Sequence, residues 1–307
     1  MIISASYKTD IPAFYGAWFM NRLNAGYCKI TNPFNRKTQA VSLRPEDVDG
    51  FVFWTKNISP FIKNLEIIHT LRYPFMILHT ITNYPRNLEP SVIAAKKSVE
   101  NIEFISKIYG SSIAVWRYDP IIFTSSTDVD FHRKTFRKLA QDLDGYTNEV
   151  IISFAQIYKK TSRNLNRVAV ISDFTWEDPK DDVKKNLVGE FADIANDHGM
   201  QLSICAQKKY VIDGTKAARC VDASRLSRIA EHTIVAKIKG RRSDCGCYQC
   251  MDIGEYDTCP HGCVYCYAVR DRLIAMDRHK NHDNRSEFLF DYRQSDDKSK
   301  QTTLYSE

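Results

Sequence analysis

The sequence predicts an α/β fold built on a parallel sheet, in the form of a complete or partial TIM-type (β/α) barrel. Short apolar segments alternate with longer segments of helical periodicity, over five or six β–α units. Most of the apolar segments are hydrophobic on successive residues, as strands are when both faces of a sheet are covered. The alternative is a doubly wound open sheet, which is disfavoured because no GxGxxG motif follows the first strand.

The elements follow one another in a regular order. The predicted strands are residues 2–6, 50–57, 74–82, 112–120, 149–155 and 201–207. The predicted helices are residues 13–27, 60–71, 90–110, 130–145, 178–200 and 222–232. Gly26 lies near the end of the first helix, while Pro90 and Gly110 bracket the third. Residues 28–33 and 39–43 interrupt the alternation and indicate a small hairpin or insertion.

Composition limits the class of protein. The chain of 307 residues is 43% hydrophobic and 26% charged, which suits a globular protein with a sizeable core. We expect one domain over residues 1–290 and a polar C-terminal tail over 291–307. No apolar run is long enough for a membrane span, and the first residues do not resemble a signal peptide. We therefore expect a cytoplasmic protein with no membrane partner, whose nine cysteines serve metal or redox chemistry before disulfides.

Polar side chains follow the C-terminal end of each predicted strand. In a barrel these ends meet at one mouth, where active sites lie. The sequence therefore places the candidate active site at this mouth. The residues concerned are Ser6, Lys8, Thr9, Asp10, Trp54, Thr55, Lys56, Asn57, His79, Thr80, Thr82, Arg117, Tyr118, Asp119, Ser153, Gln156 and Cys205.

Cys259, Cys263 and Cys266 form the first cysteine group, with the spacing C-x3-C-x2-C. Short spacings of this kind bring thiolates together around an iron–sulfur cluster, and three ligands leave the fourth iron of a [4Fe-4S] cluster open. A structural cluster and a zinc site are the alternatives, although a structural zinc usually takes four ligands in pairs. The spacing favours a [4Fe-4S] cluster.

A second group of cysteines lies in residues 205–250. Cys245, Cys247 and Cys250 have the spacing C-x-C-x2-C, and Cys205 and Cys220 precede them, Cys205 at the end of a predicted strand. Both of these could be buried core cysteines, but a C-x-C group needs partners. We expect Cys205, Cys220, Cys245 and Cys247 to hold a second iron–sulfur cluster or zinc, with Cys250 able to replace one of them. Cys28 stands alone and is interpreted as a packing residue.

The first cysteine group also carries a resemblance. With Tyr265 before the last cysteine, "CPHGCVYCYA" resembles the loop of radical SAM enzymes, and especially that of the spore photoproduct lyase branch. Over nearly the whole chain, "SASYKTDIPAFYG", "FVFWTKN", "WRYDPIIF", "SICAQ", "CGC" and "HDNRSEFL" fall in the order seen in the DUF1848 family, which the chain resembles. That family is named for its unknown function, so the resemblance itself implies radical SAM chemistry only through the shared loop.

The resemblance implies a circularly permuted radical SAM-like core, because the cysteine loop follows all the other strands instead of the first. The strand before Cys259 would then pair in parallel with residues 2–6 and place Cys263 near Ser6 and Lys8. The segment "SYKTD" would stand where radical SAM enzymes have a Gly-Gly-Glu stretch for the methionyl amine, and no such glycines occur here.

The implied function is cleavage of S-adenosylmethionine (SAM) at the [4Fe-4S] cluster to give a 5′-deoxyadenosyl radical, with a one-electron donor such as flavodoxin or ferredoxin as partner. Arg117 and Lys8 are candidates for the SAM carboxylate and form the expected catalytic set with Asp119. Trp54 or Tyr118 is expected to stack on adenine, and Ser6 and Tyr265 to lie at the cofactor.

The substrate stays open. The loop and a net charge of +6 favour a nucleic acid or nucleotide, although a mild positive excess is most often a solvated surface. The second cysteine group suits a radical SAM enzyme acting on a small molecule or peptide. A non-catalytic iron–sulfur or zinc protein that binds nucleic acid is the third hypothesis, and only the enzymes would form 5′-deoxyadenosine.

Overall fold

The computed structural model describes residues 1–32, 35–240 and 242–292, and the tail predicted at 291–307 lies mostly outside them. Its centre is an eight-stranded sheet in which every paired strand runs parallel to its neighbour. The strands, in the order of the sheet, are β11 (Lys216–Ala217), β10 (Gln201–Ile204), β8 (Glu149–Phe154), β6 (Ala114–Ile121), β5 (Phe75–Thr80), β4 (Gly50–Thr55), β1 (Ile2–Ala5) and β12 (Cys250–Asp252). The six predicted strands are thereby confirmed.

The strand order runs in one direction. From β1 to β10, each strand lies beside the one before it, without the reversal that defines a doubly wound sheet. The last strand, β12, pairs with β1, so the prediction of a parallel pairing beside residues 2–6 is confirmed. Among the described strands none joins β11 to β12, so the sheet is open there and a complete barrel is not observed.

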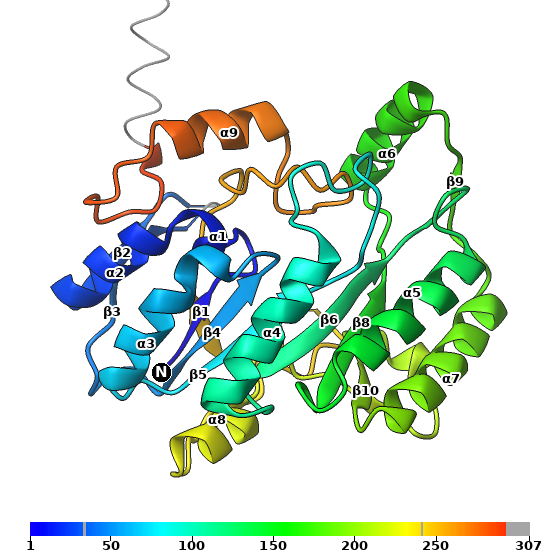
Figure 1. Cartoon of the computed structure of the whole chain (residues 1–307). Coiled ribbons are helices and arrows are strands. Elements are labelled where there is room, and N and C mark those ends of the chain that lie inside the picture. The colour runs from blue at the N-terminus through cyan, green and yellow to red at the C-terminus, as the bar shows by residue number, and fades with distance from the viewer. Residues whose placement is uncertain (33–34, 241, 293–307) are drawn as a thin grey trace, which may run out of the picture.

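Helices cover the sheet mainly on one face, where α3, α4, α5 and α7 stand side by side (Figure 1). The helices are α1 (Ile11–Phe14), α2 (Gly16–Ala25), α3 (Ile62–Thr70), α4 (Ala95–Tyr109), α5 (Val129–Asp142), α6 (Lys159–Ser172), α7 (Asp181–Asp197), α8 (Ala223–Ala230) and α9 (Arg272–Lys280), with 3-10 turns η1 (Ser59–Phe61) and η2 (Lys208–Tyr210). The interruption after α2 is an antiparallel hairpin of β2 (Tyr27–Thr31) and β3 (Thr38–Ser42), as predicted. A second small ladder pairs β7 (Phe123–Thr124) with β9 (Trp176–Glu177).

Two helix predictions differ from the structure, and two helices were not predicted. The first predicted helix is divided at Tyr15 into α1 and α2, and Gly26 caps α2 in the left-handed conformation, where glycine carries no steric penalty. The predicted helix at 90–110 begins only at Ala95, because the preceding residues form a loop in which Arg86 donates to the Val92 carbonyl. The helices α6 and α9 were not predicted.

The two faces of the sheet have different contents. Phe51, Phe53 and Trp116 point to the large helices and form the main core. Side chains of the opposite parity, such as Val52 and Val115, pack instead against α8 and the second cysteine group. This second face, the inner face, is apolar near the starts of the strands and polar near their ends.

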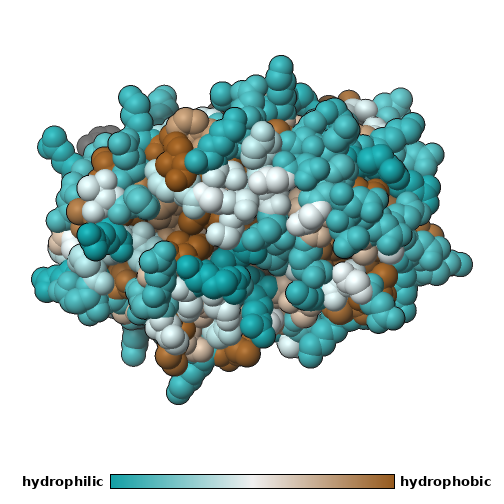
Figure 2. All heavy atoms as spheres, turned by 60° about the horizontal axis from the view of Figure 1, so that its bottom comes forward, coloured by the Kyte–Doolittle hydropathy of each residue, from teal (hydrophilic) through white to brown (hydrophobic). Residues whose placement is uncertain are grey.

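No helix within the described ranges is long and apolar enough to cross a membrane. The face of the molecule in Figure 2 is mostly hydrophilic, with hydrophobic side chains in small separate patches. The most exposed apolar side chains include Val170 and Ile171 of α6 and Val235 after α8.

Candidate functional site

The first cysteine group lies in the loop that follows β12. Because Ser4 pairs with Asp252 in a parallel ladder, the chain leaves β1 and β12 at the same edge of the sheet. The strand before Cys259 was predicted at residues 252–258, but residues 253–258 form a loop and the strand that pairs with β1 lies earlier, at β12. That loop carries the three thiols over the C-terminal ends of the strands.

The three thiols of this group lie within electrostatic range of one another. Burial raises the pKa of each of Cys259, Cys263 and Cys266, and neighbouring thiols raise the pKa of Cys259 and Cys263 further. In the described part of the chain, no three His, Cys, Asp or Glu side chains surround a common position for one metal ion. The group is therefore not a preformed single-ion site, whereas in a [4Fe-4S] cluster each thiolate binds a different iron.

A buried ion pair fixes the loop to the ends of β4 and β5. Glu89 Oε1 accepts from Lys56 Nζ (2.7 Å), from Thr82 Oγ1 (2.8 Å) and from the hydroxyl of Tyr265. Burial alone would raise the pKa of Glu89, but Lys56 and the two hydroxyls outweigh it and hold that pKa below its usual value. Glu89 also raises the pKa of Lys56 against the effect of burial, so both members stay charged beside Cys263.

Asp10 fixes the same loop to the end of β1. Its Oδ2 accepts from His261 Nε2 (2.8 Å) and from the Lys56 backbone amide (2.7 Å), while its Oδ1 caps α1 at Ala13 (2.9 Å). His261 is packed edge-on against Phe14, with ring centroids 4.6 Å apart. One carboxylate thus connects the helix, the strand end and the cysteine loop.

Asp252 organises the residues between β12 and β1. It accepts from Ser4 Oγ (2.8 Å) and Ser6 Oγ (2.9 Å), and Lys8 Nζ lies 3.7 Å from its Oδ1. Lys8 Nζ also donates to the carbonyl of Gly254 at 3.0 Å. The predicted residues Ser6 and Lys8 are therefore both held by the strand that precedes the cysteine loop.

Trp54 and Arg117 form the next part of the mouth. The Arg117 guanidinium lies 4.8 Å from the Trp54 ring centroid, and Trp54 Nε1 donates to Ser4 Oγ at 3.0 Å. Arg117 is paired with Asp119, which also accepts from Ser153 Oγ. Although burial opposes its charge, the pKa of Arg117 is raised, with Asp119 as the largest raising influence.

Tyr118 lies on the other face of the sheet, away from this mouth. Its side chain is fully buried, contacts Phe136 and Phe191, and hydrogen-bonds through its hydroxyl to His132 Nδ1 at 2.7 Å. The alternation of side chains along β6 places Arg117 on the inner face and Tyr118 among the helices. We therefore do not retain Tyr118 as an adenine-stacking residue.

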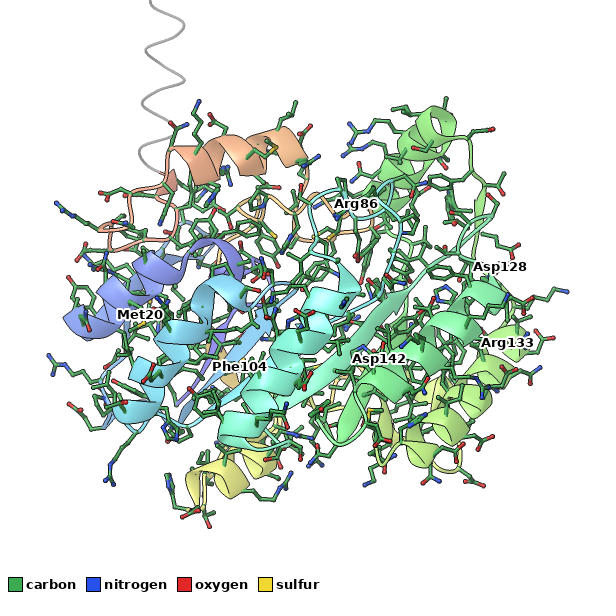
Figure 3. The ribbon with its side chains drawn as sticks, viewed as in Figure 1. Met20, Arg86, Phe104, Asp128, Arg133 and Asp142 are labelled. Carbon is green, nitrogen blue, oxygen red and sulfur yellow. The ribbon has the colours of Figure 1, made fainter. Side chains whose placement is uncertain are left out.

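A cavity of about 190 Å³ lies next to Glu89 and is lined by Thr82, Tyr84, Arg86 and Glu89, among others. Arg86 lies at the upper end of the molecule in Figure 3, above α4. The cavity is smaller than the roughly 300–1,000 Å³ typical of ligand pockets, so we do not assign SAM to it.

The second cysteine group converges on the inner face. Cys205 Sγ and Cys220 Sγ are 3.6 Å apart, Cys220 is hydrogen-bonded to Cys247, and Cys247 to Cys245. We call these four sulfurs the thiol row. Cys250, on β12, packs against the same apolar cluster. Cys28 is fully buried in the main core, in agreement with a packing role.

Two kinds of donor lie beside the thiol row. Arg242 Nη2 is 3.6 Å from Cys205 Sγ, and the backbone amide of Val221 donates to Cys247 Sγ at 3.5 Å. The pKa of Cys247 is lowered mainly by its hydrogen bonds with Cys220 and Cys245. For Cys205, the hydrogen bond with Cys220 is the largest influence lowering its pKa, and Arg117 and Arg242 add to it.

A comparison with known protein families identifies the family to which the chain belongs. The model of a domain of unknown function, DUF1848, matches residues 2–268. The chain belongs to the DUF1848 family. No curated protein and no solved structure matches it. In this DUF1848 chain, the matched range contains the whole sheet and both cysteine groups, and it ends before α9.

Sequence reasoning missed three residues that organise the DUF1848 site, namely Asp252, Glu89 and His261. Glu89 lies in a loop without strand or helix periodicity, so no local pattern marks it. Asp252 stands just before Gly254 at a strand end, which was the available signal. Of the seventeen predicted mouth residues, Ser6 and Lys8 are connected through Asp252, and Trp54, Arg117 and Asp119 contact one another in that order.

Proposed function

We propose that this DUF1848 chain is a radical SAM enzyme whose Cys259, Cys263 and Cys266 hold a [4Fe-4S] cluster. The observation that carries the proposal is the position of the cysteine loop after a strand that pairs with β1. Taken with β12 first, the strands follow the order β12-β1-β4-β5-β6-β8-β10 around the sheet, each next to the one before it. This order supports a circularly permuted, partial TIM-type barrel with the thiols at its mouth.

The donor set suits such a cluster. Three thiols from one loop leave one iron open, and the ammonium of Lys56 near Cys263 favours the anionic thiolate that a metal requires. The ion pair of Lys56 with Glu89, together with the Tyr265 hydroxyl, fixes the loop before any metal binds. When bound, the reduced cluster and SAM supply a 5′-deoxyadenosyl radical, and the protein's part is to orient and shield them.

The inner face offers groups for SAM. Arg117 presents a guanidinium that can bind a carboxylate in a bidentate manner, and Asp119 holds it in place. Trp54 is anchored by Ser4 and carries Arg117 over its ring, so the indole offers adenine its remaining surface. Lys8 is a positioning residue in this scheme, because its ammonium is already bound to Gly254 and Asp252.

Anaerobic reconstitution with iron, sulfide, SAM and dithionite tests this function. Dithionite replaces the one-electron donor, flavodoxin or ferredoxin, that the scheme needs. We expect the wild type to form 5′-deoxyadenosine, and the triple variant C259A/C263A/C266A to form none and to lose about four irons per chain. Cys28→Ala is the matched control, since that thiol lies in the core. SAM cleavage by the triple variant at the wild-type rate would disprove the assignment.

A basic helix at the mouth supports a nucleic acid or nucleotide as substrate. Helix α6 carries Lys159, Lys160, Arg163 and Arg167 and no acidic residue, and Lys160 Nζ donates to the Tyr267 carbonyl just after the cysteine loop (2.9 Å). The helix stands at the same end of the molecule as α9 and this loop (Figure 1). A positive helix beside the thiols would attract a phosphate backbone.

Salt-dependent binding distinguishes this substrate class from a small molecule or peptide. We expect single-stranded DNA or RNA to bind with a steep salt dependence, and K159E/R163E/R167E to reduce the slope of log K against log salt by about 2. Binding without formation of 5′-deoxyadenosine would favour a non-catalytic nucleic-acid-binding protein. Affinity that does not change with salt would exclude the backbone-contacting mode.

A further inference from the structure

The segment after α8 is folded with few buried residues. Residues 237–240 and 242–249 lie in a hairpin in which the Gln249 amide donates to the Lys237 carbonyl (2.8 Å) and the Lys239 amide to the Cys247 carbonyl (3.0 Å). Apart from Arg241, which is not described, the only buried residue between Glu231 and Gln249 is Ile234. Partial packing of Tyr248, Cys245 and Cys247 against the apolar cluster of the inner face therefore contributes to the position of this cysteine hairpin, as we call residues 237–240 and 242–249, but no residue of the hairpin is buried.

The base of the hairpin is where its thiols meet those of the sheet. Cys245 and Cys247 come from the hairpin, Cys205 from the end of β10, and Cys220 from the segment between β11 and α8. None of these four cysteines forms a disulfide in the structure. Four thiols from three separate chain segments therefore lie close together on the inner face.

We propose that Cys205, Cys220, Cys245 and Cys247 bind a thiophilic metal and that this metal fastens the cysteine hairpin to the sheet. The sulfur–sulfur distance of 3.6 Å between Cys205 and Cys220 is close to the edge of a tetrahedral site, about 3.8 Å for Zn–S bonds of about 2.3 Å. These two thiolates therefore share one metal atom, which is either zinc or one iron of a two-iron cluster. In a [4Fe-4S] cluster each would bind its own iron and stand further apart.

The surroundings suit an anionic metal centre. Four thiolates around zinc or a two-iron cluster carry net negative charge, and the Arg242 guanidinium beside Cys205 opposes it. The Val221 amide on Cys247 Sγ is the kind of outer contact that orients and stabilises a thiolate ligand. Among the described residues no three of these sulfurs surround a common metal position, so Cys245 and Cys247 would move toward the ion when it binds.

The proposed metal has a consequence for the mouth. Arg242 at the turn of the hairpin reaches Gln156 Oε1 (3.4 Å) as well as Cys205, and so stands beside the ends of β8 and β10. Fastening the hairpin would keep this cation near the paired Arg117 and Asp119. The inference is independent of the first cysteine group, and it holds whether or not SAM is the cofactor.

Metal analysis of the C259A/C263A/C266A variant isolates the proposed site. After anaerobic purification from cells supplied with zinc and iron, we expect this variant to retain one zinc, or two irons with two sulfides, per chain. Adding C245A/C247A should remove that metal, as should adding Cys205→Ala alone on the sheet side. Adding Cys28→Ala should leave the metal in place. Circular dichroism checks that the sheet persists in each variant.

Cobalt(II) titration and proteolysis complete the test. Cobalt should give the intense absorption of thiolate ligands in the first variant and lose it with C245A/C247A. Trypsin should cleave at Lys237 or Lys239 much faster once the metal is removed by a chelator. Metal content unchanged by C245A/C247A, no zinc or iron in the loop variant, or a stable Cys205–Cys220 disulfide in the purified protein would each overturn the proposal.

Discussion

The two cysteine groups differ in how the chain brings their thiols together. The first lies within one loop, Cys259 to Cys266, and rests on buried charges and hydroxyls such as the Lys56–Glu89 pair. The thiol row draws on three segments far apart in the sequence and lies against apolar side chains, among them Val221 and Leu226. One group is fixed by buried charges and hydroxyls, and the other lies where the cysteine hairpin meets the inner face of the sheet.

The two proposed metal centres differ in their number of cysteine ligands, three in the loop and four in the thiol row, and this difference points to different roles. A centre with a protein ligand at every position is closed and stabilises structure, whereas a centre with a free position can bind a reactant. Three thiols at the mouth fit the second kind, and four at the base of the hairpin fit the first. The comparison predicts that changes near the loop affect chemistry and stability together, while changes around the hairpin act locally.

The largest effect on stability is expected from Lys56→Met. The side chains of Lys56 and Glu89 are only 13% and 4% exposed, so the variant leaves an unpaired buried carboxylate. We expect a loss of about 3–5 kcal/mol in the free energy of unfolding, measured with urea. The double variant K56M/E89Q should recover part of this loss.

A control at the protein surface separates burial from pairing in this experiment. Lys107 and Glu103 form an exposed pair one turn apart on α4. Lys107→Met should leave the unfolding free energy nearly unchanged, because solvent screens such pairs. Equal losses of unfolding free energy in Lys56→Met and Lys107→Met would contradict the view that the buried Lys56–Glu89 pair fixes the cysteine loop.

A pH effect of intermediate size is expected from His79, at the end of β5. Burial lowers its pKa from 6.5 to about 4 in the folded protein; Asp10 partly opposes this lowering, and Lys56 adds to it. Between pH 6.5 and 4 the unfolded chain binds a proton at this site that the folded chain does not. Stability therefore falls as the pH drops through this window, by up to about 3 kcal/mol from this residue.

Urea unfolding at pH 7.5, 5.5 and 4.5 measures this dependence. His79→Leu should flatten it, because the variant lacks the group that the unfolded state protonates. An unchanged slope of unfolding free energy against pH in His79→Leu would show that other groups cause the acid sensitivity, and would remove His79 from the account of the loop region.

The smallest effect is expected from Tyr248→Phe in the cysteine hairpin. Its hydroxyl lies 3.3 Å from Arg219 Nη1 and 3.3 Å from Ser224 Oγ, at the exposed side of the hairpin. We expect a loss of less than about 1 kcal/mol and no change in metal content or tryptic cleavage. Release of the hairpin in this variant would mean that Tyr248, and not the thiols, fastens it.

The sheet was predictable because its strands are local apolar segments. A parallel pairing with β1 of the strand before the cysteine loop was also predicted, from the order of the motifs, although the strand lies at residues 250–252 and not at 252–258. Helix α6 was missed because it leaves Val170 and Ile171 85% and 76% exposed, so its apolar residues do not follow a buried stripe. Helix α9 buries only Ala275 and offers little periodicity to detect.

The site was predictable where it depends on strand ends and short spacings. The predictions about the site failed where they depended on the side of a strand to which a residue points, or on contacts between residues distant in the sequence. Along β6, neighbouring residues face opposite sides, so sequence alone could not decide between Arg117 and Tyr118 for the mouth. Glu89 and Asp252 act through partners distant in the chain, as in the bond from Ser4 across 248 residues to Asp252. No local pattern records such partners.

The place of β12 in the chain affects how the protein is made. Seven strands of the eight-stranded sheet precede β12 in the sequence, and its neighbour β1 is the first of them. During translation the N-terminal strands leave the ribosome first and can begin to fold, while closure of contacts between distant segments is slow. The loop with Cys259, Cys263 and Cys266 therefore emerges after the sheet that receives it. A cellular iron–sulfur donor would deliver its cluster to an acceptor whose sheet is already largely assembled, rather than to a nascent chain.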